Sequence, residues 1–184
     1  MNYSHTDIII LAALIKKPAH GYEIKKRMGR ILGKGELNNN ALYPSLKRLL
    51  KCGLISKEVA RSNEGGKPDR NIYSITKEGS ERLRVALGQF SEKQASDDPE
   101  FYVRIAFFEL LDANTRNAIL DSRRRALEER IAHIEQLESE GNIKSYSAKL
   151  VNMLKQKIKI EIDWISKLQE SSAVAIKEVR AGHV

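Results

Sequence analysis

Residues 38–55, NNNALYPSLKRLLKCGLI, decide the fold because they combine a helix start, an apolar stripe and a helix end. The asparagines Asn38, Asn39 and Asn40 are strong N-cap residues, and Gly53 is typical of the position just after a helix. Between them, four leucines recur at i, i+4, i+7 and i+8, the spacing of one helix face: Leu42, Leu46, Leu49 and Leu50. Pro44 has no backbone N–H and is tolerated only in the first turn. The helix therefore begins near Asn40 or starts with a slight kink.

The opposite face of this helix is polar and basic. No Asp or Glu occurs between Asn38 and Lys51, whereas a solvated helix face would usually mix Glu with Lys. Amides, a phenol and cations suit base edges and phosphates in a DNA major groove. We expect base or near-base contacts from Asn40, Tyr43 and Lys47, phosphate contacts from Ser45 and Arg48, and supporting contacts from Asn38 and Asn39. The alternative is an ordinary basic surface.

The elements on either side complete a recognisable order. Two helices precede this one, over residues 6–15 and 22–32, and the first is capped by Ser4 or Thr6. Two short strands follow, over residues 54–60 and 72–75, with a Gly-Gly hairpin loop between them, and Thr76 caps a fourth helix. Three helices followed by two looped strands predict a winged helix-turn-helix domain over residues 1–92.

The hairpin loop and its borders carry cations that a wing can place on DNA. Arg61, Lys67 and Arg70 surround the Gly65-Gly66 turn, and such a loop can lie along the phosphate backbone or enter the minor groove. We therefore expect DNA contacts from these three residues. The alternative is a flexible, solvated hairpin.

The second half of the chain predicts a helical domain over residues 97–175, with a frayed tail over 176–184. A polar stretch, residues 91–99, marks the boundary. The last long helix, from about Ser145 to Ser171, has two adjacent apolar stripes that cover roughly 200° of its circumference, more than one neighbour can bury. The preceding helix would cover one stripe as an antiparallel hairpin, and a second chain the other. The expected dimerisation residues are Leu150, Leu154, Ile158, Ile160, Trp164, Ile165 and Leu168.

Charge and composition narrow the function. Residues 1–95 hold 18 Lys and Arg against 9 Asp and Glu, a net of +9, whereas residues 96–184 hold 14 against 15, a net of −1. The basic half would bind a polyanion such as double-stranded DNA, and the neutral half would bind protein. The longest apolar run, Ile8 to Ile15, is too short to span a membrane. The lack of a leader and the single cysteine, Cys52, fit a cytoplasmic protein.

Catalytic and metal-binding patterns are not evident in the sequence. Four histidines and one cysteine lack metal-ligand spacing, and no nucleophile has an arguable base. We therefore expect no metal, no cofactor and no enzymatic activity. Cys52 follows Lys51, and the two interpretations are a redox switch and a small packing residue, of which the second is favoured. Arg123, Arg124 and Arg125 are expected on a solvated helix face, balanced by Glu128 and Glu129.

The motifs in the basic half resemble those of a known family. Residues 40–49 followed by Gly53-Leu54-Ile55 resemble the Leu-Tyr-Pro-x-Leu-x-Arg-Leu and Gly-Leu-Ile signature of PadR family regulators. Residues 20–24, His-Gly-Tyr-Glu-Ile, are similar to the start of that family's second helix, and residues 67–79 to its wing. The rest of the chain is similar to the longer, virulence-activator-like C-terminal domain of one subgroup. Asn40-Ala41 departs from the small pair often found there, which bears on base preference and not on the fold.

The resemblance implies a mainly α protein, with a winged helix-turn-helix followed by an α-helical, antiparallel coiled-coil-like dimerisation domain. It implies a homodimer that binds a palindromic operator, acts as a repressor, and responds to a small aromatic effector. Two other classes remain. An adaptor that binds protein through the same folds would show no preference among duplexes, and an enzyme has no supporting set of residues.

Overall fold

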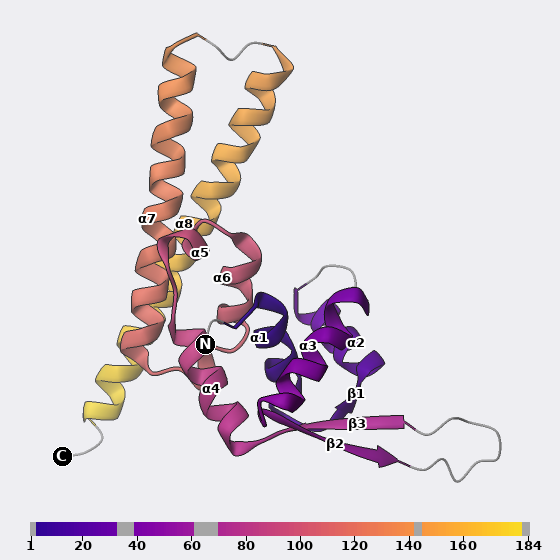
Figure 1. The fold of residues 1–184 in the computed structure, drawn as a ribbon. Coiled ribbons are helices and arrows are strands. Elements are labelled where there is room, and N and C mark those ends of the chain that lie inside the picture. Colours follow the sequence, from indigo (N-terminus) through magenta and orange to yellow (C-terminus); the bar gives the residue numbers. More distant parts are fainter. Residues whose placement is uncertain (1–2, 33–38, 61–69, 142–144, 182–184) are drawn as a thin grey trace. The chain divides into compact units, whose positions relative to one another are not determined.

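The computed structural model describes the backbone of residues 3–32, 39–60, 70–141 and 145–181, and the side chains of these residues except 30–32 and 171–181 (Figure 1). The chain forms two compact units. One comprises Met1–Gln89 with Pro99–Leu111, and the other comprises Phe90–Asp98 with Asp112–Val184. The predicted domains, 1–92 and 97–175, stay a prediction, because compactness does not show which segments fold independently.

The first unit has the predicted order of elements. Its helices and strands are α1 (His5–Leu14), β1 (Ala19–His20), α2 (Gly21–Leu32), α3 (Asn39–Lys51), β2 (Ile55–Ala60), β3 (Arg70–Ile75), α4 (Lys77–Gly88), α6 (Asp98–Ile105) and the 3-10 turn η1 (Phe108–Leu110). The strands form an antiparallel sheet in the order β1-β3-β2, with Ala19 opposite Tyr73 and Ile55 opposite Ile75. A mainly α fold with a winged helix is thus confirmed. Sequence patterns missed β1, since a two-residue strand has no periodicity.

Helix α1 is the core of the first unit. Every residue from Asp7 to Leu14 is buried, so this helix is surrounded on all sides and not amphipathic. Its start is set by a capping box, in which the Ser4 hydroxyl accepts from the backbone N–H of Asp7 and the Asp7 carboxylate accepts from that of Ser4. Helices α2, α3 and α4 and strand β3 all contact α1.

The turn after α3 joins it tightly to the sheet and to α4. Gly53 adopts a left-handed φ of 69°, and the backbone N–H of Leu54 bonds to the carbonyl of Leu49. The Thr76 hydroxyl, which caps α4, donates to the carbonyls of Gly53 and Leu54. The backbone of Gly79 in α4 lies so close to Leu54 that a Cβ at this position would be 2.0 Å from the Leu54 carbonyl oxygen. Only glycine therefore permits α4 to approach the residue that precedes β2.

The second unit is a helical hairpin with a short helix beside it. It contains α5 (Glu92–Ala95), α7 (Ala113–Ser139) and α8 (Tyr146–Ala181), and α7 runs side by side with α8 (Figure 1). Helix α5 lies within the polar stretch expected as a boundary and begins with a Ser91–Gln94 capping box. Helix α8 continues to Ala181, beyond the residue 176 at which a frayed tail was expected, and residues 182–184 lie outside the described part of the chain.

The prediction that Arg123 is solvated is wrong. This side chain is 1% exposed and joins three helices. Its guanidinium donates to Glu161 on α8 at 2.8 Å, to the Ala95 carbonyl on α5 at 2.8 Å, and to Asp98 at 2.6 Å. Burial disfavours its charge, but the bonds to Glu161 and Asp98 outweigh burial and raise the pKa of the guanidinium. Charge balance along α7 could not reveal partners on other helices.

We expect Arg123→Met to lower the free energy of unfolding by roughly 3 kcal/mol, since it leaves the part-buried Glu161 carboxylate and the Ala95 carbonyl without their donor. Chemical denaturation of the purified protein measures this loss. Arg124→Met is the matched control, because Arg124 is part-exposed and pairs across the helix surface with Asp121; its effect should be below about 1 kcal/mol. Equal losses in the two variants would contradict the assigned role of Arg123.

Candidate nucleic-acid interface

Helix α3 separates its two faces as the sequence predicts. Leu42, Leu46 and Leu49 are at most 1% exposed, and Leu50 is half-buried. The side chains on the outer face are exposed, with Tyr43 at 55%: Asn39, Asn40, Tyr43, Pro44, Lys47 and Lys51. The first turn has no acidic residue, and the last turn is basic through Arg48 and Lys51. The face therefore offers uncharged donors at its N-terminal end and cations toward its C-terminal end.

Two residues expected to bind phosphate are placed differently. Ser45 is buried, and its hydroxyl accepts a hydrogen bond from Nη2 of Arg48 at 3.0 Å. The same Nη2 donates to the Asp7 carboxylate of α1 at 2.6 Å. Arg48 lies at the edge of the outer face of α3, and from there its side chain reaches α1. We therefore leave Ser45 and Arg48 out of the proposed DNA surface.

The strands of the wing are described as far as Ala60 and from Arg70 onward. On β2 and β3, Lys57, Arg70 and Asn71 are exposed, which leaves their side chains accessible to a ligand. Asn38 before α3, and Arg61 and Lys67 in the hairpin loop, lie outside the described residues. Their predicted DNA contacts stay predictions.

A shallow pocket of about 520 Å³ lies between strand β3, the start of α2 and Tyr43 in the N-terminal half of α3. It is lined by His20, Gly21, Tyr22, Tyr43, Arg70, Asn71 and Tyr73. The rings of His20 and Tyr22 stack with centroids 6.3 Å apart, and Tyr22 is strongly exposed. Burial, assisted by Tyr43, raises the pKa of the Tyr73 phenol, so this hydroxyl remains protonated near neutral pH. Sequence patterns singled out neither Tyr22 nor Asn71 as a site residue, since only the β1–β3 pairing brings them beside Tyr43.

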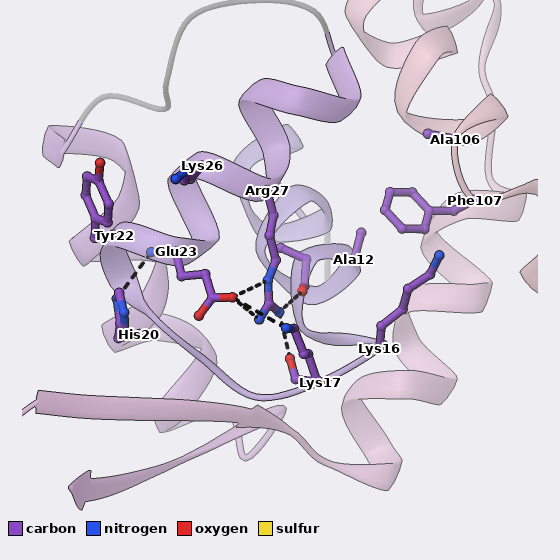
Figure 2. A pocket seen from close by; sticks show the side chains of 11 residues that line it. Ala12, Lys16, Lys17, His20, Tyr22, Glu23, Lys26, Arg27, Ala106 and Phe107 are labelled. Carbon is purple, nitrogen blue, oxygen red and sulfur yellow. Dashed lines mark hydrogen bonds and ion pairs between the residues drawn. The ribbon is translucent and has the colours of Figure 1, made fainter.

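A second pocket in the same unit, of about 620 Å³, lies between α1, α2 and the residues that follow α6 (Figure 2). Its apolar lining comprises Ala12, Ala13, Ala106 and Phe107, and exposed Lys16, Lys17 and Lys26 border it. It therefore combines an apolar wall with exposed cationic groups.

Arg27 and Glu23 brace this pocket. Arg27 donates to the carbonyls of Ala13 and Lys17 at 2.9 and 2.8 Å and to Glu23 at 2.7 Å (Figure 2). It also donates to the Pro18 carbonyl at 3.1 Å. The hydrogen bond from Arg27, opposed by burial and assisted by nearby cations, lowers the pKa of the Glu23 carboxyl. The turn between α1 and β1 is thereby held against α2.

The predicted dimerisation residues divide between two faces of α8. Ile158 and Ile165 are buried within the chain, and Leu154 and Leu168 are half-buried. Leu150, Ile160 and Trp164 are exposed, Ile160 at 69%. Ile158 and Ile165 are therefore covered by this chain's own unit. Exposed Tyr146 and Met153 share the outer arc with Leu150, Ile160 and Trp164.

Among the described residues, no group of three or more His, Cys, Asp or Glu side chains could hold a metal ion. No helix in the described part of the chain is both long and apolar enough to cross a membrane.

Comparison with known proteins places the chain in a family. The sequence profile of the transcriptional regulator PadR-like family matches residues 10–85. A PadR family transcription regulator from hypervirulent Clostridium difficile is 30% identical, and the match covers 45% of this chain and 82% of that one, with a TM-score of 0.40. A PadR-like transcription factor from Bacteroides fragilis is 30% identical over 42% of this chain and 71% of its own, with a TM-score of 0.38.

A longer match is more distant in sequence. PadR of Bacillus subtilis, solved in complex with operator DNA, is 18% identical over 90% of this chain and 98% of its own, with a TM-score of 0.44. No curated protein sequence matches the chain. The profile match and the 30% identity over most of the Clostridium difficile regulator show that the chain belongs to the PadR-like family of transcriptional regulators.

Proposed function

We propose that the protein is a sequence-specific, DNA-binding transcriptional regulator of the cytoplasm that binds a palindromic operator as a homodimer and represses transcription there. The observation that carries the proposal is the exposed, acid-free face of α3 within a winged helix. Each protomer would place α3 in a major groove, with the two half-sites about 34 Å apart or a multiple of that spacing. It would act by binding and not by catalysis.

The proposed contacts follow from what each group can offer. Asn40 and Tyr43 present hydrogen-bonding groups to base edges, and Lys47 presents a cation beside them. Arg70 and, in the loop, Arg61 and Lys67 would hold phosphates. Tyr22 is added to the proposed DNA contacts because its side chain is exposed and lines the same shallow pocket as Tyr43.

The first test is a fluorescence-polarisation titration against the DNA upstream of the protein's own gene and against a scrambled duplex, at two salt concentrations. Tight, salt-dependent binding to the upstream fragment alone supports a self-controlled regulator. Equal weak binding to both places the operator elsewhere, and selection from a random duplex library then identifies it. No binding to any duplex rejects the proposal in favour of a protein-binding adaptor.

Lys47→Ala should weaken operator binding and flatten its salt dependence, because each cation removed from the DNA surface lowers the magnitude of the slope of log K against log salt by about one. Lys159→Ala is the matched control, since Lys159 is exposed on α8 and is not one of the proposed DNA contacts. The same titration over a salt series measures both quantities. An unchanged affinity and slope for Lys47→Ala would remove Lys47 from the interface.

The dimer proposal rests on the outer stripe of α8, which comprises Tyr146, Leu150, Met153, Ile160 and Trp164. At 100° per residue these five positions fall within an arc of about 80°, the width of a helix–helix seam. The stripe covers five turns and is exposed in the single chain. A second copy offers the same stripe, and a two-fold axis would pair the two, as in most homodimers.

We expect Ile160→Glu to convert the protein from a dimer to a monomer of 20.8 kDa, because a carboxylate introduced into the seam would lose its hydration on dimerisation. Lys159→Glu changes the neighbouring exposed position and should leave the dimer intact. Sedimentation at micromolar concentration measures both masses. A wild-type protein that sediments as a monomer would refute the dimer.

The effector proposal rests on the larger pocket. An aromatic ring would pack against Phe107 and the alanines, and a carboxylate would meet Lys16 or Lys26 (Figure 2). Its volume of about 620 Å³ lies within the range of small-molecule sites. A ligand that binds one dimer shape more tightly than another would change operator affinity through that difference.

The double variant Lys16→Gln, Lys26→Gln should weaken binding of an aromatic carboxylate by roughly tenfold. This is the expected effect of losing one charge-assisted contact at a partly exposed site. Isothermal titration calorimetry with 4-hydroxybenzoate as probe measures this change. Lys51→Gln is the control, since Lys51 is exposed on α3 and does not line this pocket. Equal affinities in all variants would exclude this pocket as the probe's site, and no binding to the wild type would exclude this class of effector.

A further inference from the structure

Arg48 is directed toward the protein and not outward. Its Nη2 donates to the Asp7 carboxylate at 2.6 Å, to the Ser45 hydroxyl at 3.0 Å and to the Ser4 hydroxyl at 3.2 Å. Two of these acceptors belong to the start of α1, and the third belongs to α3 itself. One guanidinium nitrogen therefore ties the C-terminal half of α3 to the first turn of α1.

Asp7 is the buried half of this contact. Its side chain is 2% exposed, whereas that of Arg48 is 49% exposed. Oδ1 of Asp7 receives Arg48, and Oδ2 receives the backbone N–H of Ser4 at 3.0 Å and its hydroxyl at 2.9 Å. A buried carboxylate needs both hydrogen bonds and a compensating charge. Arg48 supplies that charge, so α3 is held where this carboxylate lies.

The first turn of α1 is anchored on its other side as well. His5 lies 2.9 Å from Glu100 of α6, and Glu100 pairs with Arg104 at 2.7 Å. Arg104 is fully buried and donates to the Gln89 carbonyl at 2.8 Å. The turn that holds Arg48 is thus fixed within its own unit.

We propose that Asp7 and Arg48 are positioning residues that set the rotation of α3 against α1, and so determine operator selectivity without touching DNA. The inference rests on the proposed DNA-binding function of α3. Tyr43 and Lys47 lie on the same helix, five residues and one residue before Arg48. Any rotation that the Asp7–Arg48 pair prevents would displace both of these side chains.

The geometry of a helix shows why selectivity would suffer first. Side chains reach about 5–6 Å from the helix axis, so a rotation of roughly 20° moves their tips by about 2 Å. A hydrogen bond to a base edge does not survive that displacement. The attraction between a cation and a phosphate falls slowly with distance, so non-specific binding and its salt slope would hardly change.

The test compares Asp7→Asn, Arg48→Gln and the double variant with Lys47→Gln as a matched control on the adjacent position. Each is titrated against operator and scrambled duplexes over a salt series, and a thermal melt checks folding. We expect each single variant to lose roughly tenfold in operator affinity, and the double variant no more than either single one, because coupled neighbours are non-additive. Their scrambled-duplex affinity and salt slopes should match the wild type, whereas Lys47→Gln should lower the slope.

The opposite pattern would identify Arg48 as a phosphate contact. In that case Arg48→Gln lowers the salt slope and the affinity for both duplexes, and Asp7→Asn leaves binding unchanged or tightens it by removing a competing anion. Such a result overturns the proposal.

Amide hydrogen exchange of the free protein gives a readout that is independent of DNA. The positioning role predicts faster exchange in α3 for Asp7→Asn and Arg48→Gln and not for Lys47→Gln. Unchanged exchange in all three variants overturns the proposal. A lower melting temperature for Arg48→Gln but not for Lys47→Gln supports the positioning role, since a residue that only contacts DNA does not stabilise the free protein. If the wild type binds no duplex, the proposed function fails and hydrogen exchange still decides whether Asp7 and Arg48 hold α3.

Discussion

The burial of α1 on every side is the constraint on which the first unit depends. A helix whose residues from Asp7 to Leu14 are all buried must be surrounded, and α2, α3, α4 and β3 surround it. Because the apolar stripe of α3 faces this helix, its polar side faces outward. The exposed face that we propose for DNA binding is therefore a consequence of how α1 is covered.

Buried and half-buried arginines then fix the positions of segments that apolar packing alone would leave free to slide. Arg27, Arg104 and Arg123 each donate to backbone carbonyls and to a carboxylate on the same or a neighbouring helix. A planar guanidinium with several donors suits this use better than a lysine. Apolar contacts tolerate sliding, whereas these bonds have fixed geometry, so each arginine defines the relative position of the segments that it joins.

Much of the fold and part of the site follow from local patterns. The leucine stripe of α3, the Ser4 and Thr76 caps and the Gly53 stop depend on residues within one or two turns, and the structure has all of them. The exposure of Tyr43 and Lys47 follows from the same helical spacing. Strand β1 and the pocket beside Phe107 had no such signal, because each is created by contacts between segments far apart in the chain.

The sequence by itself determined the winged helix, the helical second half and the family, since periodicity, capping and the residues 40–55 are local properties. Only the tertiary structure decided the roles of individual charges. Arg48 and Arg123 occupy positions that a helical wheel assigns to solvent or to DNA, yet both contact carboxylates from other helices. A long flexible side chain can reach several directions from one position, and its partner is chosen by whichever buried carboxylate the fold brings within hydrogen-bonding distance.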